Sequence, residues 1–244
     1  MNVEPPALYH ALSSREENYT YWYTPKCACT TTKTLLWEIE AGLGRCPPLD
    51  GTTYVHQRQH DADSPWCNSH ATIVASLDAP DRYMFTFVRN PYARSLSAYE
   101  SVATTPDSHA FFTSFGWDRT EVPTYMEFLE ILTRQDPASM NHHWQPLTSV
   151  LPFREIAFRH VGCVERYPED WAVVAAHAFA TPVVPDGARS MNRTGAGERV
   201  ASLDPSARAL IRRIYAHDFE LFGYRDDPLS QEPDAAKLAA LARG

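Results

Sequence analysis

The sequence of 244 residues lacks an apolar run long enough to cross a membrane, and its first residues lack the pattern of a signal peptide. We therefore expect no membrane span and a cytoplasmic location. Five cysteines cannot all pair with one another, and without an export signal we expect reduced thiols. No second pair at zinc-like spacing accompanies Cys27 and Cys29, so these read as small packing residues in a turn and no metal site is expected.

An excess of basic residues is also missing, because the formal net charge is −8. A general nucleic-acid-binding protein is more often basic, so we expect no nucleic-acid partner. Any anion-binding site must therefore be a local concentration of positive charge. The length fits a single domain spanning residues 1–244.

Two β-rich runs, 19–23 and 83–88, each lead into a polar turn and then a helix. Apolar spacing predicts the first helix over 32–40, and Pro91 opens the second, which runs to about residue 102. Strands that alternate with helices predict an α/β fold, with a parallel sheet covered on both faces and ligands at the carboxyl ends of its strands. Further elements are expected as a strand over 156–164 and helices over 124–133, 168–179 and 204–219, with a peripheral helix or a frayed end over 234–244.

The remaining segments are predicted as loops. Residues 1–18 form a loose N-terminal arm or short helix, and 46–76 are irregular. The loop over 104–123 is long enough to be a lid, 182–197 is a further loop, and 225–244 forms a C-terminal tail.

The first turn has the layout of a phosphate-binding loop without its glycines. Small residues allow backbone N–H groups to approach an oxyanion, and threonine hydroxyls stand at the helix start. The alternative is an ordinary capped turn with a surface lysine. The candidate anion-binding residues here are Pro25, Lys26, Cys27, Ala28, Cys29, Thr30 and Thr31.

The second turn places Arg89 directly after its strand, and Ser97 lies two helical turns further on. An arginine and a serine hydroxyl suit a terminal phosphate group. The alternative is that Arg89 caps a helix or forms an ion pair with an aspartate. Arg94 could likewise pair with an acidic neighbour.

Five segments in order resemble the carbohydrate sulfotransferases of the chondroitin/HNK-1 type, sulfotransferase family 2. Animal members of that family are usually Golgi proteins with a membrane anchor and paired cysteines, which this sequence lacks, so it is more similar to a cytoplasmic, bacterial member. The segments that carry the resemblance are Pro25-Lys26-x-x-Cys29-Thr30-x-x-Lys33, Phe87-Val88-Arg89-Asn90-Pro91-x-x-Arg94-x-x-Ser97-Ala98-Tyr99, His143-Trp144 ahead of Val161-Gly162-x-Val164-Glu165, Met191-Asn192-Arg193-Thr194, and Asp218-Phe219-Glu220-Leu221-Phe222-Gly223-Tyr224.

The resemblance implies a P-loop-like three-layer sandwich with a central, mainly parallel sheet flanked by helices. It also implies 3′-phosphoadenosine 5′-phosphosulfate as the donor, without a metal, and a carbohydrate or glycoconjugate hydroxyl as the acceptor. By position, the Lys26 turn with Thr30 and Thr31 would hold the 5′-phosphosulfate. Arg89 and Ser97 would hold the 3′-phosphate, and Arg193 would lie in a closing loop near the nucleotide.

Sulfuryl transfer needs charge stabilisation at the leaving group and a base for the acceptor hydroxyl. Lys26 is predicted to stabilise the bridging oxygen. His56 is the first candidate for the base, because the resemblance tends to place an active-site histidine there, and His143 is the second. The equally weighted alternative for His143-Trp144 is packing under the lid. The remaining candidates are His60, His70, His142 and Glu100.

Two other functions stay open at this point: an ATP-dependent phosphotransferase, and a non-catalytic sulfonucleotide-binding protein. The first would want a glycine-rich loop and a magnesium-binding carboxylate, and neither is evident. Aromatic residues of the loops 51–66 and 104–123 suit a sugar ring, although a local hydrophobic cluster explains them somewhat better. They are Tyr54, Trp66, Phe111, Phe112, Phe115 and Trp117.

Overall fold

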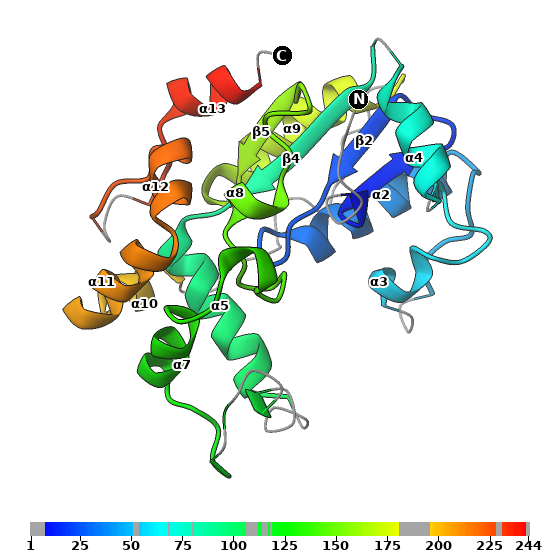
Figure 1. Ribbon diagram of the computed structural model, residues 1–244. Helices are drawn as coiled ribbons and strands as arrows, with labels where there is room; N and C mark the ends of the chain where they lie inside the picture. Colours follow the sequence, from blue (N-terminus) through cyan, green and yellow to red (C-terminus); the bar gives the residue numbers. More distant parts are fainter. Residues whose placement is uncertain are drawn as a thin grey trace.

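A five-stranded sheet forms the centre of the protein in the computed structural model (Figure 1), which describes residues 8–50, 54–67, 69–79, 81–105, 112–113, 117, 119–180, 196–227 and 231–242. The strand order is β3-β1-β2-β4-β5. Strand β4 pairs in parallel with β2 and β5, whereas β1 pairs antiparallel with β2 and β3. The sheet is therefore mixed, and the expected mainly parallel sheet is not confirmed. The strands are β1 (Ala11–Ser14), β2 (Tyr19–Trp22), β3 (Trp66–Cys67), β4 (Tyr83–Val88) and β5 (His160–Cys163).

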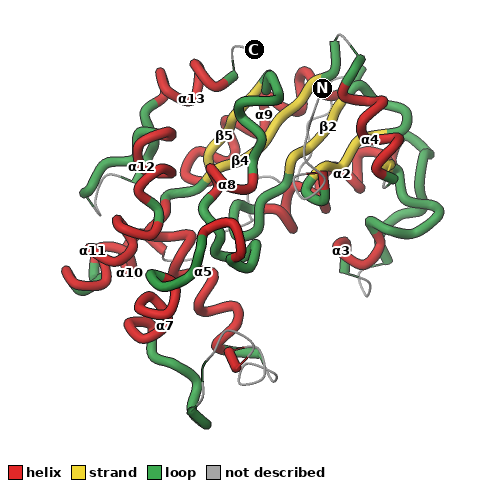
Figure 2. Tube along the Cα trace, in the orientation of Figure 1, coloured by secondary structure: helices red, strands yellow, loops and turns green. Residues whose placement is uncertain are grey.

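Helices cover both faces of this sheet, which confirms the expected α/β class. Helices α2 and α9 lie behind the sheet in the view of Figure 1, and α4 and α8 lie in front of it; Figure 2 shows the same layers by element type. The helices are α2 (Cys29–Gly42), α3 (Val55–Arg58), α4 (His70–Leu77), α5 (Pro91–Ala103), α7 (Tyr125–Leu132), α8 (Leu147–Val150), α9 (Tyr167–Ala178), α10 (Ala196–Ala201), α11 (Pro205–Ile214), α12 (Ala216–Phe222) and α13 (Ala235–Leu241), with 3₁₀ turns η1 (Pro137–Ser139) and η2 (Val164–Arg166).

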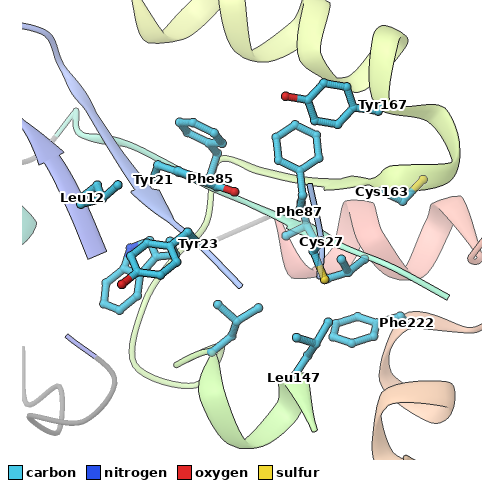
Figure 3. Packing of buried hydrophobic residues seen from close by; sticks show 14 of the residues in the cluster. Leu12, Tyr21, Tyr23, Cys27, Phe85, Phe87, Leu147, Cys163, Tyr167 and Phe222 are labelled. Carbon is cyan, nitrogen blue, oxygen red and sulfur yellow. The ribbon is translucent and has the colours of Figure 1, made fainter. Parts of the chain in front are cut away.

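Alternate residues along the strands pack into the two helical layers, as strand geometry requires. Phe87 of β4 points toward α9, where its ring lies 4.9 Å from that of Tyr167 (Figure 3). Trp22 of β2 packs toward the opposite side against Phe158, at 6.3 Å. Gly162 of β5 faces Phe87 so closely that a Cβ there would lie 2.7 Å from the phenyl ring. Close packing of the sheet against α9 therefore requires a residue without a side chain at this position.

The N-terminal segment differs from the expected loose arm. Residues Ala11–Ser14 form β1, which returns along β2 as a hairpin. The guanidinium of Arg82 donates to Thr20 Oγ1 (3.0 Å) and to the backbone oxygens of Glu17 (2.8 Å) and Ser14 (2.9 Å). These hydrogen bonds order the hairpin, although the short strand has few strand-forming residues.

Three other expectations require correction. The segment 46–76, expected to be irregular, contains α3, β3 and most of α4. The expected strand over 156–164 shortens to β5, and the expected helix over 204–219 divides at Tyr215 into α11 and α12. Strands β2 and β4 and helices α5, α7, α9 and α13 confirm the prediction to within a few residues. Half of the loop 104–123 and most of the loop 182–197 lie outside the described residues.

Candidate active site

The two turns identified in the sequence lie side by side at the carboxyl ends of β2 and β4. Thr24 Oγ1, at the end of β2, donates to the backbone oxygen of Phe87 at 2.9 Å. Arg89 Nη1 donates to the backbone oxygen of Lys26 at 3.1 Å, and Arg94 Nε donates to that of Pro25 at 3.3 Å. Three hydrogen bonds thus join the first turn to the second, and cationic side chains of both stand at one edge of the sheet.

The first turn has an unusual backbone conformation. Lys26 and Ala28 adopt left-handed φ angles of 67° and 57°. Such angles cost a residue with a side chain about 1–2 kcal/mol, and they occur often at functional sites. Helix α2 begins at Cys29 without a side-chain cap on its N-terminus. The positive end of the α2 dipole therefore faces the turn, where an anion can bind.

Lys26 is the cation of this turn. Its side chain is partly buried, and its ammonium has no hydrogen-bond or ion-pair partner among the residues that the structure describes. Burial lowers the pKa of Lys26, and the positive charges of Arg89 and Arg94 lower it further. Cys27 is fully buried, and burial raises the pKa of its thiol to about 11, so it acts as a packing residue.

The second turn is fixed by a carboxylate from the downstream sequence. Asn90 caps α5 through its side-chain oxygen, which accepts from Tyr92 N at 2.9 Å. Glu165, just after β5, accepts from Asn90 N at 2.8 Å and from the Tyr224 hydroxyl at 3.1 Å. Burial raises the pKa of Glu165 to about 7, although the nearby charge of Arg89 opposes this change. Two of the downstream segments that carry the resemblance therefore support the Arg89 turn.

Arg94 has a larger role than the sequence indicated. It is 1% exposed and forms no ion pair with an acidic residue in the described part of the chain; its Nη2 instead donates to the backbone oxygen of His142 at 3.4 Å. Its Nη1 is buried without a hydrogen-bond partner in the described part of the chain. Arg94, Ala98 and Val102 recur every four residues on the buried side of α5, and that spacing was the signal for a buried arginine.

His56 is brought to the first turn by α3, which packs against α2. Its Nε2 lies 3.0 Å from Thr30 Oγ1, and the Tyr54 hydroxyl lies 3.0 Å from the same oxygen. Burial lowers the pKa of His56 to about 4, with further lowering by the charges of Lys33 and Lys26. The imidazole is therefore neutral at physiological pH and can accept a proton.

His143 belongs to the same cluster. Its ring lies 4.3 Å from that of His142, and its Nδ1 lies 2.8 Å from Asn141 Oδ1. The pKa of His143 falls to about 3, mainly through burial and also through the charges of His142 and Lys26. The neighbouring Trp144 is a core residue that packs against Phe128. Packing, the alternative to a catalytic role for the His143-Trp144 pair, therefore describes the indole of Trp144 and not the imidazole of His143.

Three other candidates are not brought to the turns. His60 is exposed and contacts Gln59 Nε2 at 2.7 Å, and His70 is exposed at the start of α4. Glu100 forms an ion pair with Arg199. His142, in contrast, lies beside Arg94 and His143, and its ring lies 5.9 Å from that of His10.

The predicted binding residues beyond the first turn have mixed outcomes. Ser97 is partly buried on α5, and its hydroxyl has no hydrogen-bond partner in the described ranges. Arg193 lies outside the described residues, as do Phe111 and Phe115. Of the aromatic residues proposed for a sugar, Tyr54 is 54% exposed beside His56, whereas three are core residues: Trp66, Phe112 and Trp117.

Among the described residues, no cluster of three or more histidine, cysteine or acidic side chains is arranged to hold a metal ion. In the same ranges, the structure contains no helix with the length and hydropathy of a membrane span.

Comparison with known proteins gives a consistent result. The sequence matches the profile of the sulfotransferase family over residues 9–225. It is 27% identical to carbohydrate sulfotransferase 14 of Homo sapiens, with alignment over 89% of this chain and 60% of the relative. It is also 22% identical to carbohydrate sulfotransferase 11 of Rattus norvegicus, with alignment over 91% of this chain and 69% of that relative. The chain thus spans about 60% of the length of the first of these relatives. No solved structure gives a significant match.

Proposed function

The chain belongs to the sulfotransferase family, and we propose that it transfers a sulfuryl group from 3′-phosphoadenosine 5′-phosphosulfate to a carbohydrate hydroxyl. The observation that carries the proposal is the hydrogen-bonded pair of turns, which sets Lys26 and Arg89 at one sheet edge. The donor nucleotide is anionic at both its 5′ and 3′ ends, so each turn would receive one end. The names of the relatives support a carbohydrate as the acceptor.

The residues present fit this nucleotide. The uncapped start of α2 and the unpaired ammonium of Lys26 would hold the 5′-phosphosulfate, with the hydroxyls of Thr30 and Thr31 beside them. Arg89 and the hydroxyl of Ser97 would hold the 3′-phosphate. The buried, unpartnered Nη1 of Arg94 supports an anion near the same edge. A contact from Arg193 stays a prediction.

Lys26 is the residue that would assist departure of the leaving group. As the acceptor oxygen bonds to sulfur, the bond from sulfur to the bridging oxygen breaks, and its electron pair stays on the bisphosphate product. The Lys26 ammonium would stabilise that developing negative charge. Donors held in advance at the turn pay no reorganisation cost during the reaction.

His56 would accept the proton of the acceptor hydroxyl at Nε2. This nitrogen faces Thr30 at the start of α2, where the sulfuryl group would lie. A general base must be neutral before it acts, and the lowered pKa of His56 satisfies that condition at pH 7. Tyr54, exposed beside the His56 ring at 4.8 Å, would offer an aromatic face to a sugar.

A thermal-shift titration tests the nucleotide. We expect 3′-phosphoadenosine 5′-phosphate to stabilise the protein by about 2–3 kcal/mol at a hundredfold excess over its Kd, and ADP much less. Stabilisation by ATP–magnesium alone would contradict the proposal and favour a phosphotransferase. Transfer of labelled sulfate to a panel of glycans then tests the reaction, since tight binding without any transfer would identify a non-catalytic sulfonucleotide-binding protein.

The cytoplasmic location and the bacterial source inferred from the sequence stay predictions. The relatives named above come from mammals.

A further inference from the structure

Lys33 is a fully buried lysine with unusual partners. Its side chain, on the second turn of α2, is 0% exposed. Nζ lies 2.6 Å from Gln59 Oε1, 3.1 Å from His56 Nδ1 and 3.3 Å from the ring centroid of Tyr23. Nζ thus contacts an amide oxygen, a ring nitrogen and an aromatic face. These three partners match the three tetrahedral directions that remain on the nitrogen beside its bond to Cε.

The protonation state of Lys33 determines the tautomer of His56. An ammonium can only donate, so it requires an unprotonated Nδ1 on His56. The ring proton of neutral His56 then lies on Nε2 and points to Thr30, so that Nε2 cannot act as a base. A neutral amine has two N–H groups, which point to Gln59 Oε1 and the Tyr23 ring, so its lone pair points to His56 and accepts Nδ1–H. In that state the Nε2 lone pair faces Thr30 and is ready to accept a proton.

We propose that Lys33 is a positioning residue that holds His56 in its base-competent tautomer and takes up a proton from it during the reaction. This inference rests on the proposed function above. The acceptor hydroxyl gives its proton to His56 Nε2, and His56 Nδ1 gives its own proton to the lone pair of Lys33. One proton enters the pair and one ammonium forms, while His56 stays neutral throughout. Loss of one proton to solvent after product release restores the starting state.

The surroundings of Lys33 support a neutral amine. Burial lowers its pKa to about 7, and the Cys29 thiol on the same helix opposes this only in part. The other titratable groups near it are Tyr23 after β2, His56 on α3, and His10 and His142, whose pKa values burial lowers most and the charge of Lys33 lowers further. None of these side chains is a carboxylate, so the ammonium would have, besides the His56 ring nitrogen, only the Gln59 amide oxygen and the Tyr23 ring to stabilise it, with no negative charge in contact.

The amide of Gln59 is oriented for this role. Its Nε2 contacts His60 Nε2 at 2.7 Å, which leaves Oε1 directed at Lys33. Gln59 Oε1 accepts from Lys33 in either charge state, so it anchors Nζ while the contact with His56 changes direction.

A titration by NMR tests the proposal without turnover. The sequence contains three lysines, Lys26, Lys33 and Lys237, so the Cε signals of ¹³C-lysine-labelled enzyme can be assigned from single variants. We expect Lys33 to titrate near pH 7. Over the same pH range, the ring ¹⁵N shifts of His56 should change from the Nε2–H to the Nδ1–H tautomer. An Nε2–H tautomer that persists to pH 9, or a Lys33 that stays charged to that pH, would overturn the proposal.

Two substitutions separate charge from positioning. Lys33→Met has similar length and keeps the apolar stem, and we expect kcat to fall ~10-fold with loss of the rise in kcat near pH 7. Lys33→Arg cannot lose its proton and should hold His56 as Nε2–H, so that kcat falls ~100-fold and does not recover at high pH. Lys237→Met on the exposed face of α13 is the matched control and should behave as wild type. Normal kcat in Lys33→Arg would contradict the proposal.

The two proposals fail in different ways. A coupled titration of Lys33 and His56 in an enzyme that sulfates no acceptor would contradict the proposed function and support the coupling. Normal sulfuryl transfer with an uncoupled titration would contradict the role of Lys33 alone. Affinity for the bisphosphate, measured by calorimetry on both variants, should stay within about threefold of wild type, because Lys33 is not among its predicted contacts.

Discussion

Arg89 Nη1 donates to the backbone oxygen of Lys26 at 3.1 Å, so the cation of one turn holds the backbone of the other. One guanidinium nitrogen is committed to this contact, and the rest of the planar fork has no other hydrogen-bond partner among the described residues, so it can bind a phosphate. The position of the 3′-phosphate is thereby tied to that of the 5′-phosphosulfate. The enzyme would recognise the spacing of the two anionic groups as well as their charge.

Arg89→Met should therefore reduce affinity for the nucleotide that has a 3′-phosphate more than for one without it. We expect the Kd of 3′-phosphoadenosine 5′-phosphate to rise ~10–100-fold, because a charge-assisted hydrogen bond is worth about 1.5–3 kcal/mol. The Kd of adenosine 5′-phosphosulfate should change much less. Calorimetry with both ligands measures the difference, which cancels any general disturbance of the Lys26 turn. An equal loss for the two ligands would show that Arg89 acts only through that turn.

Lys26 requires a substitution that tolerates its left-handed backbone. Asparagine occupies such angles more readily than most residues, so Lys26→Asn removes the ammonium with little added strain. We expect kcat to fall ~10²–10³-fold, as for other lost donors to a developing oxyanion. Single-turnover kinetics measure the chemical step directly. Near-normal turnover would remove Lys26 from the mechanism, and the exposed Lys237→Asn supplies the reference.

Replacement of each imidazole by asparagine decides between the two candidate bases. His56 contacts Thr30 Oγ1 at the start of α2, whereas His143 Nδ1 is bound to Asn141, which leaves its Nε2 as an acceptor. We expect His56→Asn to lower kcat ~10²–10⁴-fold and His143→Asn to lower it less. Turnover in both variants, measured with donor saturating, gives the comparison. The reverse order would make His143 the base and would leave Lys33 without its proposed role.

Much of the site could be predicted because the sequence patterns that form it are short and local. A buried strand, a short polar turn and a helix occur within about fifteen residues, so Lys26 and Arg89 were recognisable and their adjacency followed from strand geometry. The hairpin β1–β2 was missed, since Ala11–Ser14 owes its order to hydrogen bonds from the distant Arg82. A four-residue strand of two apolar and two serine residues is too short to show an alternating pattern.

The buried basic residues were harder to predict than the turns. Lysine and arginine in helices usually face solvent. Lys33, however, stands three and four residues before the buried Leu36 and Trp37, on the same side of α2. That spacing predicts a buried lysine only if its place on the apolar side of the helix is given more weight than the usual preference of lysine for solvent. The partners of Lys33 come from α3, a four-residue helix within a segment that reads as irregular.

The imidazole cluster makes stability sensitive to acid, and His10 allows this to be measured at a residue that has no proposed catalytic role. His10 is 5% exposed, and burial, followed by the charge of His142, lowers its pKa from 6.5 to about 4. The folded state therefore binds this proton less readily than the unfolded state, and stability falls as pH drops from 6.5 toward 4. Over the interval from pH 6.5 to pH 5 the loss amounts to about 2 kcal/mol.

His10→Asn should remove this part of the acid sensitivity, while its amide can still donate to the Tyr23 backbone oxygen that His10 Nδ1 contacts at 3.1 Å. Denaturant unfolding at pH 8 and pH 5 gives the free energy of unfolding of both proteins. We expect the variant to lose about 1–2 kcal/mol less than wild type between these two values. Replacement of the exposed His217 by asparagine controls for removal of an imidazole as such. An equal loss in His10→Asn and wild type would show that His10 is protonated in the folded state at pH 5, which its burial against the rings of Tyr9 and Tyr23 opposes.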